Sequence, residues 1–276
     1  MTIVLVGLGV IGGSFGLALK EAGYTSVYGI DTNETTLKKA KKLGIIQEGF
    51  TDGEEILPQA DLIIFSLYPT LIAQFIQSHP KKFKPNAILT DVTGIKQGII
   101  KEISPLLPDS VDFIFGHPMA GREKRGIDFA NQAVFKDANY LLTPTVKNQE
   151  KNLVFLEQLV KELGFKKVTR ITPHEHDQLI GFTSQLPHAI AVALVNSDIN
   201  EKTGDFVGDS YRELTRIANI NEELWSELFI GNKSNLLEAI DLFETELTKI
   251  KAAVAENDTK TLKRLFIHST ERRSQL

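Results

Sequence analysis

Short apolar runs alternate with segments of helical spacing through the first 170 residues of the chain. The runs have the length of strands and are nearly continuously apolar, which is typical of strands buried on both faces of a parallel sheet. They lie at Ile3–Val6, Val27–Ile30, Leu62–Leu67, Ala87–Leu89, Phe113–Phe115 and Tyr140–Leu142. The helical segments lie between them, at Gly12–Ala22, Glu34–Leu43, Leu71–Gln77 and Lys96–Leu106. This alternation predicts a doubly wound α/β domain over residues 1–171.

The pattern changes after residue 171, where helical spacing replaces the alternation. Thr172, Pro173 and Glu175 form a helix start, with Thr as N-cap, Pro at the first helical position and Glu closing a capping box. Further on, apolar residues recur at a period near 3.5, at Leu236, Ile240, Phe243, Leu247, Ile250 and Val254. We therefore expect an all-helical domain over residues 172–276. The apolar seam packs within this domain or buries a subunit interface, and the pattern leaves both open.

A glycine-rich motif follows the first apolar run and opens the first helical segment. It matches G-x-G-x-x-G and consists of Gly7, Leu8, Gly9, Val10, Ile11 and Gly12. The first glycine permits a tight turn, the second lets the backbone approach a pyrophosphate, and the third lets helix and strand pack closely. In this strand–turn–helix context the motif predicts a Rossmann-type dinucleotide-binding domain.

Asp31 ends the second apolar run, 24 positions after Gly7 (31 − 7). A carboxylate at about this offset accepts hydrogen bonds from the adenosine ribose hydroxyls and repels a 2′-phosphate. Thr32 and Asn33 follow it, with no arginine to accommodate that phosphate. The cofactor is therefore predicted to be NAD rather than NADP or FAD. A structural alternative for Asp31 is an N-cap for the next helix.

Composition and charge narrow the class of protein. The 276 residues contain no cysteine, which excludes a disulfide framework and zinc–thiolate sites, and no helical metal pair is found. The net charge is −4, and the basic cluster Lys38–Lys42 has the spacing of a solvated helix face, so no nucleic-acid partner is expected. The apolar start at Thr2–Val6 is too short for a signal segment, and no long apolar stretch follows. We expect a cytoplasmic protein with no membrane partner.

His117 is the histidine that the pattern singles out. It follows the fifth apolar run within the segment Phe115–Glu123, at the carboxyl end of a predicted strand, where open α/β sheets bind their ligands. Pro118 and the glycines on both sides constrain the backbone around this titratable side chain. A catalytic residue and a turn histidine bonded only to backbone both fit this position. By contrast, His174 and His176 lie two apart on a helix start and lack the spacing of a metal pair.

Several segments together resemble the prephenate dehydrogenase family over nearly the whole chain. They read Gly116-His117-Pro118-Met119-Ala120-Gly121 with Glu123, Asp91 through Lys96, Gln185-Leu186-Pro187-His188-Ala189, and Leu214-Thr215-Arg216-Ile217-Ala218 with Trp225. The glycine motif alone is shared by many dehydrogenases. The histidine block combined with the later segments is much more specific.

The resemblance implies NAD-dependent oxidative decarboxylation of prephenate to 4-hydroxyphenylpyruvate in tyrosine biosynthesis. His117 is then expected to accept the hydroxyl hydrogen bond of the substrate, which is worth roughly 10²–10⁴ in rate. Arg216 is expected to clamp a substrate carboxylate through two parallel hydrogen bonds, and His188 to contact the substrate. Glu123, Thr93 and Gln185 complete the expected substrate site. A small-molecule substrate, no metal, and a homodimer through the helical domain also follow.

Two positions depart from the family pattern. Gly94 stands where many relatives carry a serine whose hydroxyl supports the catalytic histidine, so we expect the neighbouring Thr93 to supply that hydroxyl. Gln185 stands where some relatives have histidine.

Three alternatives remain open at this point. Arogenate dehydrogenase would use the same chemistry on a substrate with an alanyl side chain. A β-hydroxyacid dehydrogenase would need a catalytic lysine in the helical part, for which Lys233 is the candidate. A non-catalytic NAD-binding sensor is the third, and the presence of His117 and Arg216 argues against it.

Overall fold

The computed structural model describes residues 1–121 and 124–275. The strands are β1 (Ile3–Val6), β2 (Val27–Ile30), β3 (Glu48–Phe50), β4 (Leu62–Phe65), β5 (Ile88–Asp91), β6 (Asp112–Pro118), β7 (Asn139–Thr143) and β8 (Lys167–Arg170). The sheet domain carries the helices α1 (Val10–Glu21), α2 (Glu34–Lys42), α3 (Pro69–Ser78), α4 (Gln97–Ile103) and α5 (Glu150–Glu162). The strands form one sheet in the order β3-β2-β1-β4-β5-β6-β7-β8. A Rossmann-type domain is thereby confirmed.

The sheet is parallel except at one pair. β6 and β7 run antiparallel, with His117 opposite Leu141, whereas every other neighbouring pair is parallel. The sequence pattern predicted a parallel sheet, and this pair departs from it because the described residues between β6 and β7 form no α-helix that would cross back over the sheet. The chain instead returns from the carboxyl end of β6 through short 3₁₀ turns at Ile127–Phe129 and Gln132–Phe135.

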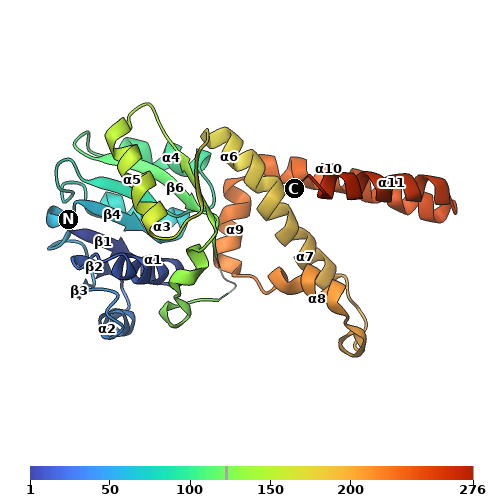
Figure 1. The fold of residues 1–276 in the computed structure, drawn as a ribbon, viewed down its shortest axis with the longest axis horizontal. Helices are drawn as coiled ribbons and strands as arrows, with labels where there is room; N and C mark the ends of the chain where they lie inside the picture. Colours follow the sequence, from blue (N-terminus) through green and yellow to red (C-terminus); the bar gives the residue numbers. More distant parts are fainter. Residues whose placement is uncertain (122–123, 276) are drawn as a thin grey trace.

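Helices cover both faces of the sheet (Figure 1). One apolar core contains side chains of α1, α2 and α5, and the other contains side chains of α3 and α4. Because both faces are covered, central strands such as β1 and β4 are buried at every position. The carboxyl ends of the parallel strands therefore form an edge that is accessible between the helices.

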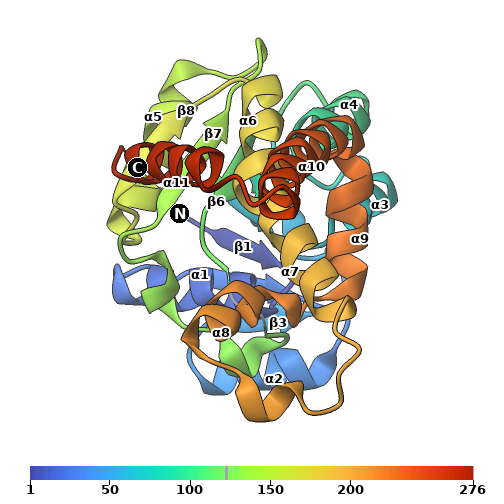
Figure 2. The ribbon, with the colours of Figure 1, turned by 90° about the vertical axis from the view of Figure 1, so that its right-hand side faces the viewer.

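The second domain contains only helices among its described residues, 172–275. They are α6 (Pro173–Ile180), a π-helical turn (Gly181–Gln185), α7 (Leu186–Asn196), α8 (Asp209–Thr215), α9 (Glu222–Gly231), α10 (Lys233–Ala255) and α11 (Thr259–Arg273). Figures 1 and 2 show α10 and α11 as a hairpin that projects away from the sheet. The last strand ends at Arg170 and α6 begins at Pro173, and we keep the domain boundary at residue 171 as a proposal.

The predicted capping box at the start of α6 is present. The Thr172 hydroxyl accepts from the Glu175 amide, and the Glu175 carboxylate accepts from the Thr172 amide. From Pro173 to Asn196 the helix is continuous, an 18-residue window of it has a mean hydropathy of 1.3, and by length and composition alone it is able to cross a membrane. This is weak evidence, because one such helix also occurs in soluble proteins. The expectation of no membrane partner stays a prediction.

Candidate active site

Gly7 and Gly12 have the backbone roles that the sequence predicts for them, and the predicted approach of a pyrophosphate to Gly9 stays a prediction. Gly7 has φ = +87°, which disfavours any side chain. A Cβ on Gly12 would lie 1.9 Å from the carbonyl oxygen of Gly7, so only glycine lets α1 pack on the loop. A Cβ on Gly9 would meet nothing within 4 Å, and α1 begins after it without a side-chain cap. The first amides of α1 are thus available to an anionic group such as a pyrophosphate.

The carboxylate of Asp31 binds the glycine loop rather than capping a helix. It accepts hydrogen bonds from the amides of Leu8 and Asn33, both at 2.9 Å. Helix α2 is capped by Asn33, whose side-chain oxygen accepts from the amides of Thr35 and Thr36. The N-cap alternative for Asp31 is therefore wrong. Its carboxylate stands beside the loop, as a ribose-binding acid requires.

Ser66 supplies a further polar group at the same place. It follows β4, and its Cβ lies 3.1 Å from where a Cβ on Gly12 would stand. Its hydroxyl oxygen is buried and has no hydrogen-bond partner within residues 1–121 and 124–275. A buried hydroxyl without a partner is unfavourable. A dinucleotide seated on the glycine loop would offer the missing partner, so this position fits a cofactor site.

The site contains a buried ion pair between Asp91 and Lys96. Both side chains are 0% exposed, and Lys96 Nζ donates to Asp91 Oδ2 at 2.7 Å. Asp91 also accepts from the amides of Thr93 and Gly116, at 3.0 and 3.1 Å. Burial lowers the pKa of Lys96, and the attraction of Asp91 opposes that shift. Asp91 thus ties the end of β5 to the Gly116 backbone next to His117.

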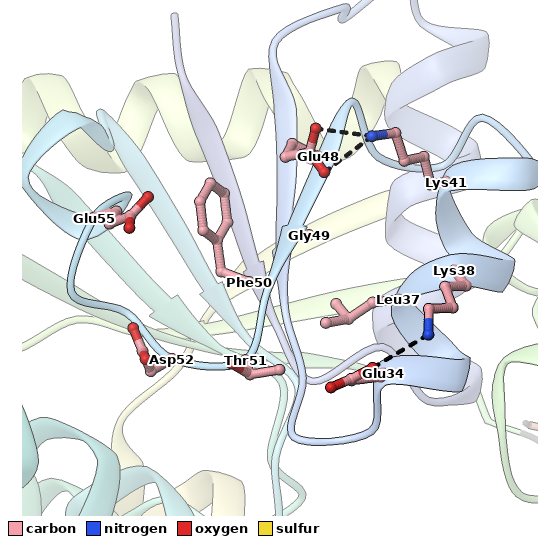
Figure 3. A pocket seen from close by; sticks show the side chains of 10 residues that line it. All are labelled: Glu34, Leu37, Lys38, Lys41, Glu48, Gly49, Phe50, Thr51, Asp52 and Glu55. Carbon is pink, nitrogen blue, oxygen red and sulfur yellow. Dashed lines mark hydrogen bonds and ion pairs between the residues drawn. The ribbon is translucent and has the colours of Figure 1, made fainter.

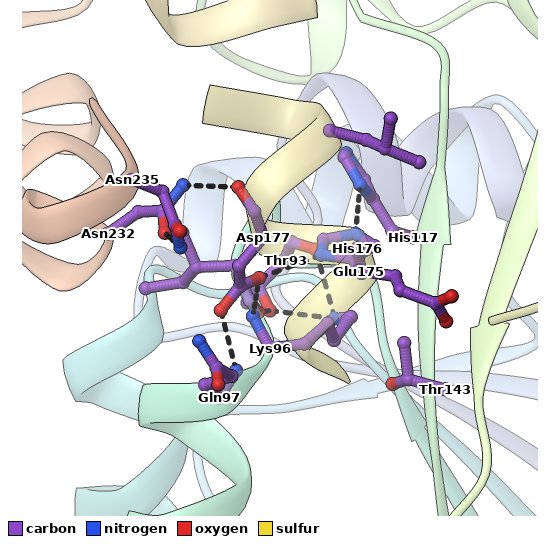
Figure 4. A network of polar contacts seen from close by, with 12 residues as sticks. Thr93, Lys96, Gln97, His117, Thr143, Glu175, His176, Asp177, Asn232 and Asn235 are labelled. Carbon is purple, nitrogen blue, oxygen red and sulfur yellow. Dashed lines mark hydrogen bonds and ion pairs between the residues drawn. The ribbon is translucent and has the colours of Figure 1, made fainter. Parts of the chain in front are cut away.

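His117 lies at the carboxyl end of β6 and is bonded to a second histidine. His117 Nδ1 is 2.9 Å from His176 Nε2, and His176 Nδ1 is 2.8 Å from Asp177 Oδ1 (Figure 4). His176 and Asp177 are buried residues of α6, in the helical domain. The chain Asp177–His176–His117 therefore crosses from one domain to the other.

Asp177 also fixes the start of a helix in the sheet domain. Its two carboxylate oxygens accept from the amides of Lys96 and Gln97, at 2.7 and 2.8 Å. These amides lie at the beginning of α4, where helix amides have no partner within the helix. One carboxylate therefore holds both His176 and the segment that contains Lys96 (Figure 4).

Both bonded histidines are held in the neutral form. Burial, together with the unfavourable placement of a second positive charge beside His176 and Lys96, holds the pKa of His117 well below its usual range. Burial also lowers the pKa of His176, although the hydrogen bond to Asp177 opposes that shift. Neutral imidazole is the form that can accept a proton near neutral pH.

The structure contradicts the expectation that Thr93 supports His117. The Thr93 hydroxyl donates to Asp91, lies 3.1 Å from the Ile95 carbonyl oxygen, and accepts from Lys96 Nζ. It is thus committed to the buried ion pair, because Asp91 turns it toward the sheet. At Gly94 a Cβ would lie 3.7 Å from His117 Nε2, so a serine there would face the other ring nitrogen.

Gln185 is occupied within the helical domain. Its amide nitrogen donates to the Leu228 carbonyl oxygen at 2.9 Å, and its amide oxygen accepts from Asn232 at 2.8 Å. Asn232 in turn donates to the Asp177 carbonyl oxygen. These bonds give Gln185 a packing role between helices, and its contact with substrate stays a prediction.

His188 and Arg216 lie in adjoining elements of the helical domain. His188 is on α7, where its Nδ1 bonds the Ser184 carbonyl oxygen at 2.8 Å and its ring stacks on Trp225 with 3.6 Å between centroids. Arg216 is exposed at the start of a 3₁₀ turn that packs against α7. Glu123 lies outside the described residues. The predicted site residues thus form one group around His117 and another around His188.

Two further sequence hypotheses concern lysines. The lysines of α2 form exposed ion pairs, Lys38 with Glu34, Lys39 with Asp128 and Lys41 with Glu48, which agrees with a solvated face. The hollow of about 480 Å³ beside them, between α2 and β3, contains two of these pairs (Figure 3). The other hypothesis takes Lys233 as the catalytic lysine of a β-hydroxyacid dehydrogenase. Lys233 is the exposed first residue of α10, next to the buried Asn232.

His176 is the functional residue that sequence reasoning missed. In the sequence it stands out only as half of a possible metal pair with His174. The described residues contain no cluster of three His, Asp or Glu side chains suited to a metal. No local signal marks His176 as a site residue, because its burial and its bond to His117 arise only in the folded protein.

Comparison with known proteins identifies the family. Residues 15–169 match prephenate dehydrogenase, nucleotide-binding domain, and residues 172–268 match prephenate dehydrogenase, dimerization domain. The prephenate dehydrogenase of Bacillus subtilis (strain 168) is 30% identical over 274 residues, which are 96% of this chain and 73% of that protein.

Solved structures agree with this match. The crystal structure of prephenate dehydrogenase from A. aeolicus in complex with hydroxyphenyl propionate and NAD+ has a TM-score of 0.90 and 29% identity, covering 100% of this chain and 99% of that one. Synechocystis arogenate dehydrogenase has a TM-score of 0.83 and 28% identity, with the same coverage. From the matched domains, the glycine loop and the His117 segment, we conclude that this chain belongs to the prephenate dehydrogenase family and is an NAD-dependent oxidoreductase of tyrosine biosynthesis.

Proposed function

We propose that the chain oxidatively decarboxylates prephenate to 4-hydroxyphenylpyruvate, with His117 as the catalytic base. The observation that carries the proposal is a neutral histidine at the carboxyl edge of the sheet, in the domain that holds the glycine loop. NAD, when bound, accepts the hydride that leaves the carbinol carbon of the ring. His117 accepts the hydroxyl proton as the ring carbonyl forms. The carboxylate then departs as carbon dioxide, its bonding electrons make the ring aromatic, and the ring oxygen takes a proton back to give the phenol.

The cofactor is held by the groups around the glycine loop. Asp31 binds the adenosine ribose, and the first amides of α1 bind the pyrophosphate. Because Asp31 repels a 2′-phosphate, NAD is preferred over NADP.

The substrate dianion is held by the helical domain. Arg216 binds a carboxylate through parallel hydrogen bonds, and His188, stacked on Trp225, contacts the substrate from α7. The family resemblance assigns Glu123 to substrate binding as well. The roles of these residues rest on the family resemblance and on the packing of α7 against the turn that begins at Arg216.

The active form is proposed to be a cytoplasmic homodimer. Residues 172–268 match the dimerization domain of the family, and apolar side chains of α10 are exposed in the single chain. A small molecule is the substrate partner.

The substrate is decided by following reduced-nicotinamide absorbance with prephenate or arogenate and with NAD or NADP, in all four combinations. Turnover of prephenate with NAD, reduced by roughly 10²–10⁴ in His117→Asn, is the expected result. Turnover of arogenate alone would favour the second candidate, which the similarity to Synechocystis arogenate dehydrogenase supports. Measurable NAD binding without turnover in any combination would contradict an enzymatic function and favour the sensor alternative.

A further inference from the structure

We propose that His176 and Asp177 are positioning residues, which fix the ring proton of His117 on Nδ1 and leave Nε2 as the basic nitrogen. This inference deepens the proposed function and rests on His117 being the base. Neither residue needs to touch the substrate, because each acts through the hydrogen-bonded chain that ends at His117.

The carboxylate of Asp177 sets the direction of donation along the hydrogen bonds that join Asp177, His176 and His117. Both of its carboxylate oxygens accept backbone hydrogen bonds, from Lys96 and from Gln97. A carboxylate in that position accepts hydrogen bonds and donates none. His176 Nδ1, 2.8 Å from Asp177 Oδ1, must therefore carry a hydrogen.

The remaining assignments follow from the chemistry of imidazole. A neutral imidazole has one N–H and one acceptor nitrogen. With its hydrogen on Nδ1, His176 presents a lone pair at Nε2, and the nitrogen 2.9 Å away, His117 Nδ1, must donate to it. His117 then carries its hydrogen on Nδ1 and a lone pair on Nε2. The burial that keeps both rings neutral is consistent with this order.

His117 Nε2 faces a position where the chain has no side chain. A Cβ at Gly94 would lie 3.7 Å from this nitrogen and no closer than 3.5 Å to any other atom, including Leu228. A family serine at this position would therefore act on Nε2, whereas His176 acts on Nδ1. This chain lacks the serine, and the buried pair from α6 provides its orientation of His117 instead.

Four variants separate a positioning role from a packing role. In Asp177→Ala, His176 Nδ1 loses its acceptor, so neither ring is held in one tautomer. In His176→Leu, His117 Nδ1 loses its acceptor while Asp177 keeps its two backbone donors. In His176→Gln, an amide can donate to Asp177 and accept from His117, which restores the chain. His174→Gln is the control, because His174 is exposed on the same helical turn.

The first measurement needs no substrate. In ¹⁵N-histidine-labelled protein, with resonances assigned by comparing His117→Asn and His176→Leu, the nitrogen shifts report which ring nitrogen carries the hydrogen. We expect the Nδ1–H form of His117 in the wild type and in His174→Gln, and a mixture of the Nδ1–H and Nε2–H forms in Asp177→Ala and His176→Leu. An Nε2–H form in the wild type would overturn the proposal. So would a pure Nδ1–H form that persists in a folded Asp177→Ala; if that variant does not fold, His176→Leu decides in the same way.

The second measurement is steady-state kinetics with the substrate that the wild type turns over. We expect kcat to fall by about 10²-fold or more in His176→Leu, with KM within about threefold, and to recover to within about tenfold of wild type in His176→Gln. Equal loss in the leucine and glutamine variants, or a rise in KM with kcat retained, would overturn the positioning role. A wild type without any turnover would refute the proposed function instead, while the nitrogen shifts still decide the tautomer.

Discussion

The sheet domain and the helical domain differ in where their side chains find partners. In the sheet domain even a lysine is wholly buried, and Lys96 has Asp91 within the same chain as its partner. In α10 the apolar seam begins buried at Leu236 and becomes exposed along the helix, so that Leu247 is 51% and Val254 59% exposed. The seam thus packs within its own domain at its start and projects without cover at its end.

This difference teaches that the helical domain, unlike the sheet domain, leaves part of its apolar pattern without a covering surface among the described residues. Apolar positions that repeat at heptad spacing and lie exposed usually meet another surface. The match of this region to a dimerization domain indicates what that surface is, namely a second copy of the chain. Packing within the domain is thus confirmed for the start of the seam at Leu236, and burial of its exposed end in a subunit interface stays a prediction.

The largest change in the free energy of unfolding is expected when the buried ion pair of the sheet domain is removed. Asp91→Ala leaves Lys96 buried without its partner, and we expect the free energy of unfolding to fall by about 3–5 kcal/mol. Asp128→Ala, which removes the exposed partner of Lys39, is the matched control and is expected to change it by about 1 kcal/mol or less. Urea unfolding of both variants measures the difference. Similar losses in the two would show that burial does not govern these pairs.

A charge on the exposed part of the seam tests the other domain. Leu247→Asp is expected to raise the dimer dissociation constant by about 10²-fold, because the carboxylate would be buried between the subunits. Thr245→Asp carries the same charge on the opposite side of α10 and is expected to leave the dimer intact. Analytical ultracentrifugation at micromolar concentration distinguishes the two. A Leu247→Asp dimer as tight as wild type would place the interface elsewhere.

Low pH is expected to destabilise the junction of the two domains, where His117 and His176 are bonded. His117 and His176 have lowered pKa values in the folded protein, so below about pH 6.5 the unfolded chain binds more protons than the folded one. Stability is then fully present above that pH and is lost as the pH falls below it. Thermal unfolding between pH 8 and 5 measures this loss, which His176→Leu is expected to reduce. The acid limb of kcat/KM is likewise expected below pH 6.5.

The smallest expected effect comes from removing the hydroxyl of Ser66 in the sheet domain. The Ser66 hydroxyl is buried without a partner among the described residues, and we expect its partner to be NAD. Ser66→Ala is therefore expected to weaken NAD binding by about 1 kcal/mol, roughly fivefold, without lowering the stability of the NAD-free protein. Calorimetric titration of NAD measures the change. Unaltered affinity would mean that the hydroxyl has no contact with the cofactor.

The elements that the sequence predicted are those with a strong local pattern. β1 and β2 have the predicted bounds, because each is a buried apolar run between clear turns. β3 and β8 were missed because edge strands need no continuous apolar run, and β8 reads Lys-Val-Thr-Arg. The antiparallel direction of β7 was also not predictable, since a buried strand has the same pattern in either direction.

Among the site residues, too, only those with a local sequence pattern were predictable. The glycine loop and Asp31 were predictable, because their spacing along the chain encodes their geometry. The bond between His117 and His176 joins residues 59 positions apart in two domains, and no local pattern encodes it. The commitment of Thr93 to Asp91 was hidden for a related reason, since it depends on a lysine that the fold buries completely.

The π-helical turn at Gly181–Gln185 has a consequence for how this family can vary. The turn lies between His176 and His188 within one continuous helix. It sets the angle between the part of this helix that faces the sheet domain and the part that packs against Trp225. Each residue of a regular α-helix advances the rotation by about 100°. Loss of a single residue from this turn would thus swing His188 by about a quarter of a circle relative to His176. Natural insertions and deletions are therefore expected in the loop at 197–208 rather than in this turn.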